Sequence, residues 1–477
     1  MKILLDRQSP APVYLQIRDR LRQLIHAGSL KPGDRLPSIR QMARTAQVNK
    51  LTVIEAYGVL EADGLVQARQ GAGYFVNPSP VSTSFESTFA PAQTVIIPAD
   101  GVQSFLDVSN AMLRAQVRPD VINFSSGFPP PCDIPDLQRI ARRAVKNTAE
   151  RLFEHNYPQG DPLLREQITQ LLVHQGLAIS ADNLIITNGS MQALSLLVQQ
   201  FIQPGDWVVV EAPTFHGFLS VLKQAQAQVI GIPMTATGMN LDLLEQYLQS
   251  HRPKLIYTIS TLHNPTGITT DLGHRQQLLA LAEAYDCRII EDNAYERLSF
   301  GATPPPIKAL DTGDRVIYLN TFSKTLMPAL RVGYAVITGA DYGPLLERKL
   351  LHDFHVSLVS QAIVSEYLAS GHYRRRLHHL QAQNQQNQAV MLQALAKHFP
   401  PEASWTVPQG GVFLWVQLSA RRSLQRFCQA ALQANVLVGP GSIFFPDQQG
   451  YPGLRLSFAQ TVADIERGIA VLGRLLQ

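Results

Sequence analysis

The stretch Thr321-Phe322-Ser323-Lys324-Thr325-Leu326, followed by Arg331-Val332-Gly333-Tyr334, is the most informative part of this 477-residue chain. It places one lysine among hydroxyl side chains, with an arginine shortly after. A lysine amine bonds reversibly to aldehydes, and hydroxyls together with an arginine suit a phosphate group. The stretch therefore predicts a site for a phosphorylated aldehyde.

A carboxylate completes this chemistry. Asp292 directly follows the apolar run Ile289-Ile290, and Tyr295 comes soon after it. Open α/β sheets place ligand groups at such strand ends, where a carboxylate can keep a pyridine nitrogen protonated. Amine, acid and phosphate site together meet the demands of pyridoxal 5'-phosphate (PLP). The alternative is an ordinary Asp in a turn.

Short apolar runs alternate with helical patterns from Val121 onward. This alternation predicts an α/β fold with a mostly parallel sheet covered by helices. The runs expected to form strands are Leu184–Thr187, Trp207–Val210, Leu255–Thr258, Cys287–Ile290 and Val316–Leu319.

Positive charge is concentrated at the N-terminus. Residues 1–77 hold 11 Lys/Arg against 6 Asp/Glu, and the other residues hold 30 against 31. A basic segment of this size suits nucleic-acid phosphates when it also carries a DNA-binding pattern. The three cysteines lie far apart, and no run approaches the roughly 20 apolar residues of a membrane span. We expect a cytoplasmic protein without a metal site or membrane segment.

The first 77 residues show the pattern of three helices and a hairpin. Ser38 and Asn49 are suited to cap the second and third helices, and glycines separate the runs Leu65–Ala68 and Tyr74–Val76. These features predict a winged helix-turn-helix. The segments Leu36–Ala43, Val48–Val53, Ala56–Glu61 and Gly71–Val76 resemble the DNA-binding domain of the GntR family of bacterial regulators.

This resemblance implies a recognition helix in the major groove of DNA. Its inward-facing residues should be Val53, Ile54, Tyr57 and Leu60. The family usually has Ser-Arg where this chain has Asn49-Lys50, and Lys lacks the planar fork that pairs with guanine. Base recognition by Lys50 therefore stays open, while phosphate contact is expected. The implied DNA-binding residues are Arg40, Asn49, Lys50, Thr52, Gln70 and Gly71.

The region from about Val121 to Gln477 resembles the fold-type I, aspartate-aminotransferase-like PLP proteins. Asn188–Ala193 and Asn264–Gly267 carry the resemblance together with the stretches around Asp292 and Lys324. It implies that Lys324 forms the internal aldimine and that the helix after Gly189 meets the cofactor phosphate. The implied cofactor-binding residues are Gly189, Ser190, Met191, Phe215, Asn264, Asp292, Tyr295, Thr321, Ser323, Lys324, Arg331 and Tyr157.

Two further implications concern ligand and assembly. Tyr157 matches the residue that reaches the phosphate of the neighbouring subunit, which implies a homodimer. Arg455 matches the arginine that grips a substrate carboxylate. The alternative for Arg455 is a surface arginine beside a strand.

The order of the two parts is similar to that of the MocR subfamily of GntR-type regulators. We expect a winged helix over 1–77, a linker over 78–102 and an aminotransferase-like domain with large and small lobes over 103–477. The resemblance implies a PLP-dependent transcription regulator that binds double-stranded operator DNA as a homodimer, with or without domain swapping. PLP itself, or a small amino compound captured at Lys324, would be the effector. An active PLP-dependent aminotransferase carrying a DNA-binding head is the alternative.

Overall fold

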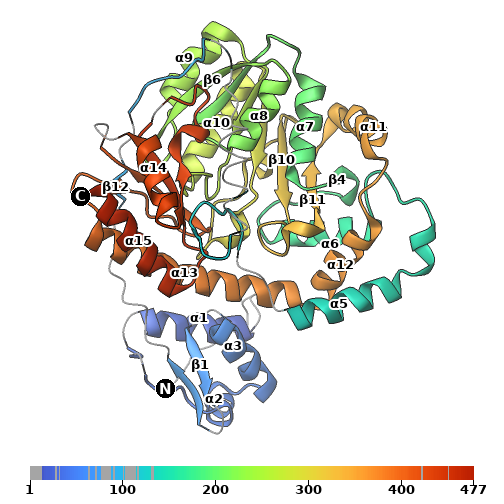
Figure 1. The fold of residues 1–477 in the computed structure, drawn as a ribbon. Coiled ribbons are helices and arrows are strands. Elements are labelled where there is room, and N and C mark those ends of the chain that lie inside the picture. Colours follow the sequence, from blue (N-terminus) through green and yellow to red (C-terminus); the bar gives the residue numbers. More distant parts are fainter. Residues whose placement is uncertain are drawn as a thin grey trace. The chain divides into compact units, whose positions relative to one another are not determined.

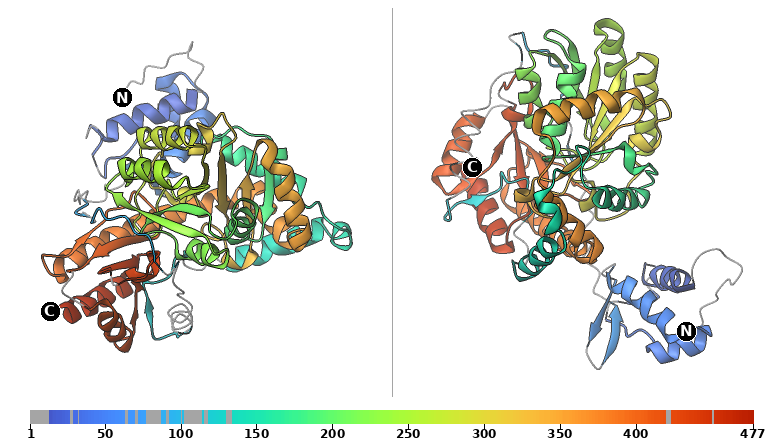
Figure 2. Two further views of the ribbon diagram at one scale, coloured as in Figure 1. Left: turned by 90° about the horizontal axis from the view of Figure 1, so that it is seen from above. Right: turned by 90° about the vertical axis from the view of Figure 1, so that its right-hand side faces the viewer.

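The fold is taken from a computed structural model (Figures 1 and 2). The chain divides into two compact units, Met1–Phe85 and Glu86–Gln477. The structure describes residues 13–26, 29–31, 33–62, 65–69, 72–76, 87–89, 92–99, 101, 114, 118–129, 134–419, 423–449 and 451–477.

The N-terminal unit is a winged helix-turn-helix, as the sequence predicts. Its elements are α1 (Val13–His26), α2 (Ile39–Ala46), α3 (Lys50–Ala62) and the antiparallel hairpin β1 (Val66–Arg69) and β2 (Gly73–Val76). Ser38 caps α2 by accepting from the Gln41 amide at 3.2 Å. Asn49 accepts from the Leu51 amide at 3.1 Å, so the caps lie where the sequence predicts them.

One expectation for α3 is wrong. Val53, Tyr57 and Leu60 are fully buried, whereas Ile54 is 44% exposed. Residues 53, 56, 57 and 60 share one face of a helix with 3.6 residues per turn, and residue 54 is rotated about 100° away from residue 53. Helical geometry therefore turns Ile54 toward solvent.

The larger unit contains a sheet of the strand order β4-β11-β10-β9-β8-β5-β6-β7. The neighbours β10, β9, β8, β5 and β6 pair in parallel, while β11 pairs antiparallel with both β10 and β4. This confirms the expected mostly parallel sheet. Its strands are β4 (Leu184–Thr187), β5 (Trp207–Ala212), β6 (Gln228–Thr235), β7 (Gly238–Met239), β8 (Leu255–Thr258), β9 (Arg288–Asp292), β10 (Val316–Thr321) and β11 (Gly333–Val336).

Helices cover both faces of this sheet (Figure 1). Side chains alternate along each strand, so Val208 and Val210 of β5 join the core under α7 (Ser190–Phe201) and α8 (His216–Gln224). Val209 points to the opposite core, under α9 (Leu241–His251) and α10 (Leu272–Ala284). Further helices are α5 (Ile134–Asn147), α6 (Pro162–Val173), α11 (Tyr342–Asp353) and α12 (Leu358–Ala369).

A second lobe is built on the antiparallel sheet β12-β13-β16-β15. The long helix α13 (His372–His398) leads into it and packs on α15 (Val462–Leu476). Its other elements are β12 (Ser404–Trp405), β13 (Phe413–Gln417), α14 (Leu424–Gln433), β15 (Gly439–Pro440) and β16 (Gly453–Ser457), and the pair β14 (Val436–Leu437) and β3 (Ile122–Asn123) joins it. Among the described residues no helix is long and apolar enough to cross a membrane.

Part of the segment predicted to be a linker, residues 78–102, packs on the larger unit. Residues 87–89 and 92–99, which we call the strap, belong to the larger unit. Ile96 exchanges backbone hydrogen bonds with Gly231 of β6, and Phe89 and Ile96 are both buried against the body. The Pro- and Ser-rich composition predicts an extended conformation but not this docking. The expected boundary at 102–103 lies outside the described residues.

Candidate functional site

Most of the residues predicted to bind a cofactor come from one edge of the large sheet. Adjacent parallel strands end at the same edge, so the loops after β5, β8, β9 and β10 meet there. They surround a cavity of about 260 Å³. Its lining includes the predicted residues Ser190, Met191, Phe215, Asn264, Tyr295, Thr321, Ser323, Lys324, Arg331 and Arg455.

Lys324 projects into this cavity just beyond the end of β10. Its Nζ lies 3.6 Å from the centre of the Phe128 ring and 5.2 Å from that of Tyr295. Burial, followed by the positive charge of Arg455, lowers the pKa of Lys324 to about 7. A substantial fraction of this amine is therefore unprotonated at neutral pH, which is the form that attacks an aldehyde.

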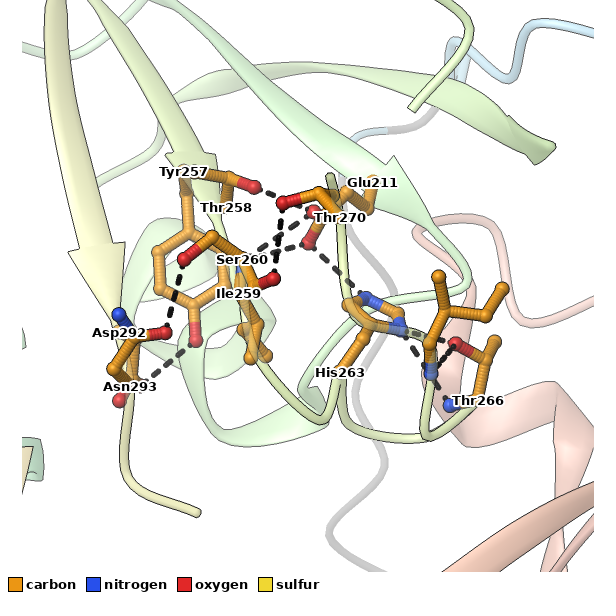
Figure 3. Close-up of polar contacts among 11 residues, drawn as sticks. Glu211, Tyr257, Thr258, Ile259, Ser260, His263, Thr266, Thr270, Asp292 and Asn293 are labelled. Carbon is orange, nitrogen blue, oxygen red and sulfur yellow. Dashed lines mark hydrogen bonds and ion pairs between the residues drawn. The ribbon is translucent and has the colours of Figure 1, made fainter. Parts of the chain in front are cut away.

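Asp292 ends β9 behind the cavity and is 4% exposed. Its Oδ2 accepts a 2.9 Å hydrogen bond from the Tyr257 hydroxyl, whereas its Oδ1 has no hydrogen-bond partner (Figure 3). Burial raises the pKa of Asp292 to about 6, although the Tyr257 hydrogen bond opposes the shift. A buried carboxylate oxygen without a partner is costly, so this atom is suited to accept from a bound N–H group.

A buried polar network supports the turn that carries Asn264 (Figure 3). Glu211, at the end of β5, accepts hydrogen bonds from the Thr258 hydroxyl at 2.6 Å and the Ile259 amide at 3.1 Å. Its Oε2 also lies 3.1 Å from His263 Nε2, at ion-pair distance but without hydrogen-bond alignment. His263 Nδ1 contacts the Thr266 hydroxyl at 2.8 Å, which ties the turn to the sheet.

Arg331 and the start of α7 form a polar cradle. Arg331 donates from Nη1 to the Ser323 hydroxyl at 3.2 Å and from Nη2 to the Asn188 carbonyl at 3.1 Å. Thr321 donates to the same Ser323 oxygen at 3.0 Å. Gly189 has a φ of 75°, and a Cβ there would lie 2.4 Å from Arg331 Nη2. The backbone conformation at Gly189 favours glycine, and a side chain there would force Arg331 to shift. Ser190 and Met191, the first residues of α7, line the cavity, where the amides at a helix start suit an anion.

Arg455, in β16, is 4% exposed and so is not the surface arginine of the alternative interpretation. It donates from Nη1 to Asn264 Oδ1 at 2.8 Å and from Nη2 to the Ser125 carbonyl at 2.6 Å. Its Nε is buried without a hydrogen-bond partner. The rings of Phe413 and Phe444 lie 5.0 and 4.9 Å from its guanidinium carbon.

Sequence reasoning missed several residues of the site. The loop Ser125–Phe128 and Ile443 line the cavity, and Tyr257 lies behind it. His216 also lines the cavity, where burial and then the charges of Arg455 and Lys324 lower its pKa to about 3. The glycine and aromatic pair in Ser125-Ser126-Gly127-Phe128 was the available signal.

Tyr157 is the predicted residue that this chain does not bring to the cavity. It is 58% exposed and lines a separate hollow beside Arg151 and Asp161. Gly189 and Asp292 lie next to the cavity rather than in its lining.

The DNA-facing residues predicted on the N-terminal unit lie at its surface. Arg40 on α2 and Asn49 and Lys50 at the start of α3 are exposed, and Thr52 is half-buried. Leu51, which sequence reasoning did not single out, is 70% exposed beside them. Gln70 and Gly71 lie outside the described residues.

Comparisons with known proteins match both units. Residues 13–76 match the family of bacterial regulatory proteins of the gntR type, and residues 119–472 match aminotransferase class I and II. An uncharacterized HTH-type transcriptional regulator of Escherichia coli, YdcR, is 31% identical over 97% of this chain and 99% of its own length. The chain belongs to the MocR subfamily. It is a GntR-type regulator fused to an aminotransferase-like domain.

Solved structures resemble the aminotransferase-like domain of this MocR-type protein. An archaeal alanine:glyoxylate aminotransferase is 32% identical with a TM-score of 0.74, covering 79% of this chain and 96% of its own. LysN, an α-aminoadipate aminotransferase from Thermus thermophilus solved with N-(5'-phosphopyridoxyl)-L-leucine, is 30% identical with a TM-score of 0.72. That match covers 78% of this chain and 98% of LysN. These neighbours support a fold-type I architecture.

Proposed function

We propose that this chain is a transcription regulator whose aminotransferase-like domain holds PLP at Lys324 and thereby adjusts the affinity of its N-terminal domain for operator DNA. The observation that carries the proposal is a cavity whose lining brings Lys324 together with Arg331 and Arg455, while the charge of Lys324 acts on the buried Asp292 at the end of β9. The same chain carries a GntR-type DNA-binding domain.

The residues around the cavity fit the cofactor. PLP, when bound, supplies an aldehyde that bonds reversibly to amines and a protonated ring that withdraws electrons. Lys324 would hold the aldehyde, and Asp292 Oδ1, which lacks a hydrogen-bond partner, would accept from the ring nitrogen. Phe215 suits the face of the ring, and Asn264 and Tyr295 suit its oxygen. The phosphate would be held by Thr321, Ser323, Arg331, Gly189, Ser190 and Met191.

Arg455 would hold the acid group of a small amino compound. A guanidinium that is buried beside two rings has a strong need for an anionic partner, and its Nε still lacks one. An effector that carries both an amine and a carboxylate therefore fits between Lys324 and Arg455. PLP as the sole effector is the second model, and in that model Arg455 is dispensable.

The assembly we propose is a homodimer. Tyr157 is exposed in the single chain and would reach the phosphate of the neighbouring subunit. Domain swapping between the two subunits is compatible with a separate N-terminal unit.

The strap would connect the cavity of the aminotransferase-like domain to the DNA-binding domain. It is continuous in sequence with the DNA-binding domain and packs in a cluster with Ala212, Trp415 and Phe444. Phe444 lies over Arg455, and Ala212 leads into the loop that carries Phe215. A movement of Arg455 or of the Phe215 loop would therefore change the packing of the strap, which leads in sequence to the DNA-binding domain.

An active aminotransferase with a DNA-binding domain is the second candidate. It is favoured by the complete set of Lys324, Asp292 and Arg455, because regulation by PLP alone would leave Arg455 without a role. Purified full-length protein mixed with PLP, amino acids and keto acids separates the two. Multiple turnovers at about 1 per second or faster would favour the enzyme. DNA affinity that changes with PLP or an amino acid, without such turnover, would favour the regulator.

A further inference from the structure

Phe128 has a position in the cavity that the proposed cofactor contacts do not use. Its ring centre lies 3.6 Å from Lys324 Nζ, the atom that would bond to the cofactor aldehyde. Phe128 lines the cavity and is 39% exposed, so it forms part of the wall between the cavity and solvent. Any compound whose amine reaches the Lys324 position must therefore pass or contact this ring.

The loop that carries Phe128 is held by the groups that would meet the ligand. Arg455 Nη2 donates to the Ser125 carbonyl at 2.6 Å, and the Tyr295 hydroxyl donates to the Gly127 carbonyl at 2.9 Å. Gly127 is packed so tightly that a Cβ there would lie 2.7 Å from the Tyr295 oxygen. A carboxylate arriving at Arg455 would thus compete with the Ser125 carbonyl directly beside Phe128.

The described lining of the cavity has no unassigned charged residue that could pair with a charged side chain of the ligand. Among the described residues of its lining, the cations are Lys324, Arg331 and Arg455, and carboxylates are absent. The proposed function assigns these three cations to the aldehyde, the phosphate and the ligand carboxylate. His216 is uncharged at neutral pH because burial beside Arg455 and Lys324 lowers its pKa to about 3.

The cavity also has apolar surface that could contact the side chain of an amino-acid ligand. Phe128 and Ile443 both line the cavity, and an apolar side chain placed against them would be removed from water. A side-chain carboxylate or ammonium would instead lose its hydration without gaining a described partner.

We infer that Phe128 is a specificity-determining residue that selects amino acids with an apolar or aromatic side chain as ligands of this cavity. The inference rests on the proposed function, since it requires the amine at Lys324 and the carboxylate at Arg455. Phe128 would be the third contact point and would pack against the substituent on the ligand's α-carbon.

The test uses full-length protein loaded with PLP and titrated with L-leucine, L-phenylalanine, L-alanine, L-glutamate and L-lysine. Binding is followed by the change in the visible absorbance of the bound cofactor. We expect leucine and phenylalanine to bind at least about tenfold more tightly than alanine, because each buried methylene contributes about tenfold or more. Glutamate and lysine should bind more weakly than leucine.

Variants separate specificity from folding. Phe128→Ala should remove most of the leucine-to-alanine ratio, and Phe128→Leu should restore part of it. Tyr247→Ala, on the outer helix α9, is the matched control and should keep the ratio. A merely structural defect would weaken all ligands together and leave the ratio unchanged.

Each result is decisive. Tightest binding of glutamate or lysine, or an unchanged ratio in Phe128→Ala, would overturn the inference while leaving the proposed function intact. Wild-type protein that shows no visible band with PLP would overturn the proposed function and the inference with it.

Discussion

At the residue scale, the site depends on two groups whose protonation is set by burial. Aspartate and lysine side chains ordinarily titrate far from neutrality, but burial brings the pKa of Asp292 to about 6 and the pKa of Lys324 to about 7. The first must be ionised and the second unprotonated for the proposed chemistry. Both conditions improve as the pH rises through this range, so the two residues work in the same direction.

Capture of PLP should therefore depend on pH. Below pH 7 the Lys324 amine becomes protonated, and each further unit lowers the free amine about tenfold. We expect the rate of appearance of the visible band to fall on the acid side of about pH 7 and to level off above it. Lys324→Ala should show no such band at any pH. A wild-type rate that is independent of pH between about 5.5 and 8.5 would contradict this environment for Lys324.

Tyr257 should act on the cofactor through Asp292. Tyr257→Phe keeps the ring that stacks on Phe218 at 4.0 Å but removes the hydrogen bond to the carboxylate. Without this donor the pKa of Asp292 should rise further, and PLP affinity at pH 7 should fall by about three- to tenfold. Tyr247→Phe on α9 is the control. Equal PLP affinity of Tyr257→Phe and wild type across pH would show that Tyr257 has no influence on the site.

At the element scale, local motifs and long-range pairings differ in how well the sequence predicts them. Lys324, Arg331 and Asn264 lie in short patterns whose residue types state their chemistry, and the structure brings them to one cavity. The glycine and aromatic pair at Gly127-Phe128 is a local signal, but the position of this loop depends on the pairing of β3 with β14, more than 300 residues later in the chain, which a local pattern does not predict. Tyr257 was missed for the same reason, since its partner is decided by the register of β8 with β9.

The strap shows the limit of composition as a guide. The Pro, Ser, Thr and Ala content of residues 77–98 predicts an extended linker, but the burial of Phe89 and Ile96 depends on an apolar cluster with Ala212, Trp415 and Phe444, which are distant in sequence. Composition alone does not predict such a cluster.

Loosening the strap should weaken the link between cofactor and DNA. Ile96→Ala removes a buried side chain from the cluster that contains Phe444, at a local cost of about 2 to 4 kcal/mol. We expect the effect of PLP on DNA affinity to shrink by more than half, while PLP affinity itself changes less. Ile97→Ala is a matched control, because Ile97 is the neighbouring residue and is 39% exposed. A full PLP response in Ile96→Ala would exclude the strap as the route.

The start of α3 should contact DNA phosphates. Lys50→Ala and Arg40→Ala should each weaken DNA binding and reduce the slope of log affinity against log salt by about 1. Arg467→Ala, an exposed arginine on α15, should leave the slope unchanged. An unaltered slope in both test variants would show that these residues do not lie at phosphates.

At the scale of the whole molecule, the chain joins two domains, each of which matches a protein family of its own. The aminotransferase-like body resembles enzymes over most of its length, and the N-terminal unit matches bacterial regulators. We propose that the cavity around Lys324 adjusts DNA binding. Coupling of about 1 to 3 kcal/mol between the two units is enough to change DNA affinity several-fold to about a hundredfold.

The most direct test measures the affinity of full-length protein for DNA from its own upstream region, with and without PLP, for wild type and Lys324→Ala. We predict that PLP changes the affinity of wild type at least several-fold and leaves that of Lys324→Ala unchanged. Wild-type affinity that is indifferent to PLP and to amino acids, or an equal response in Lys324→Ala, would contradict the account.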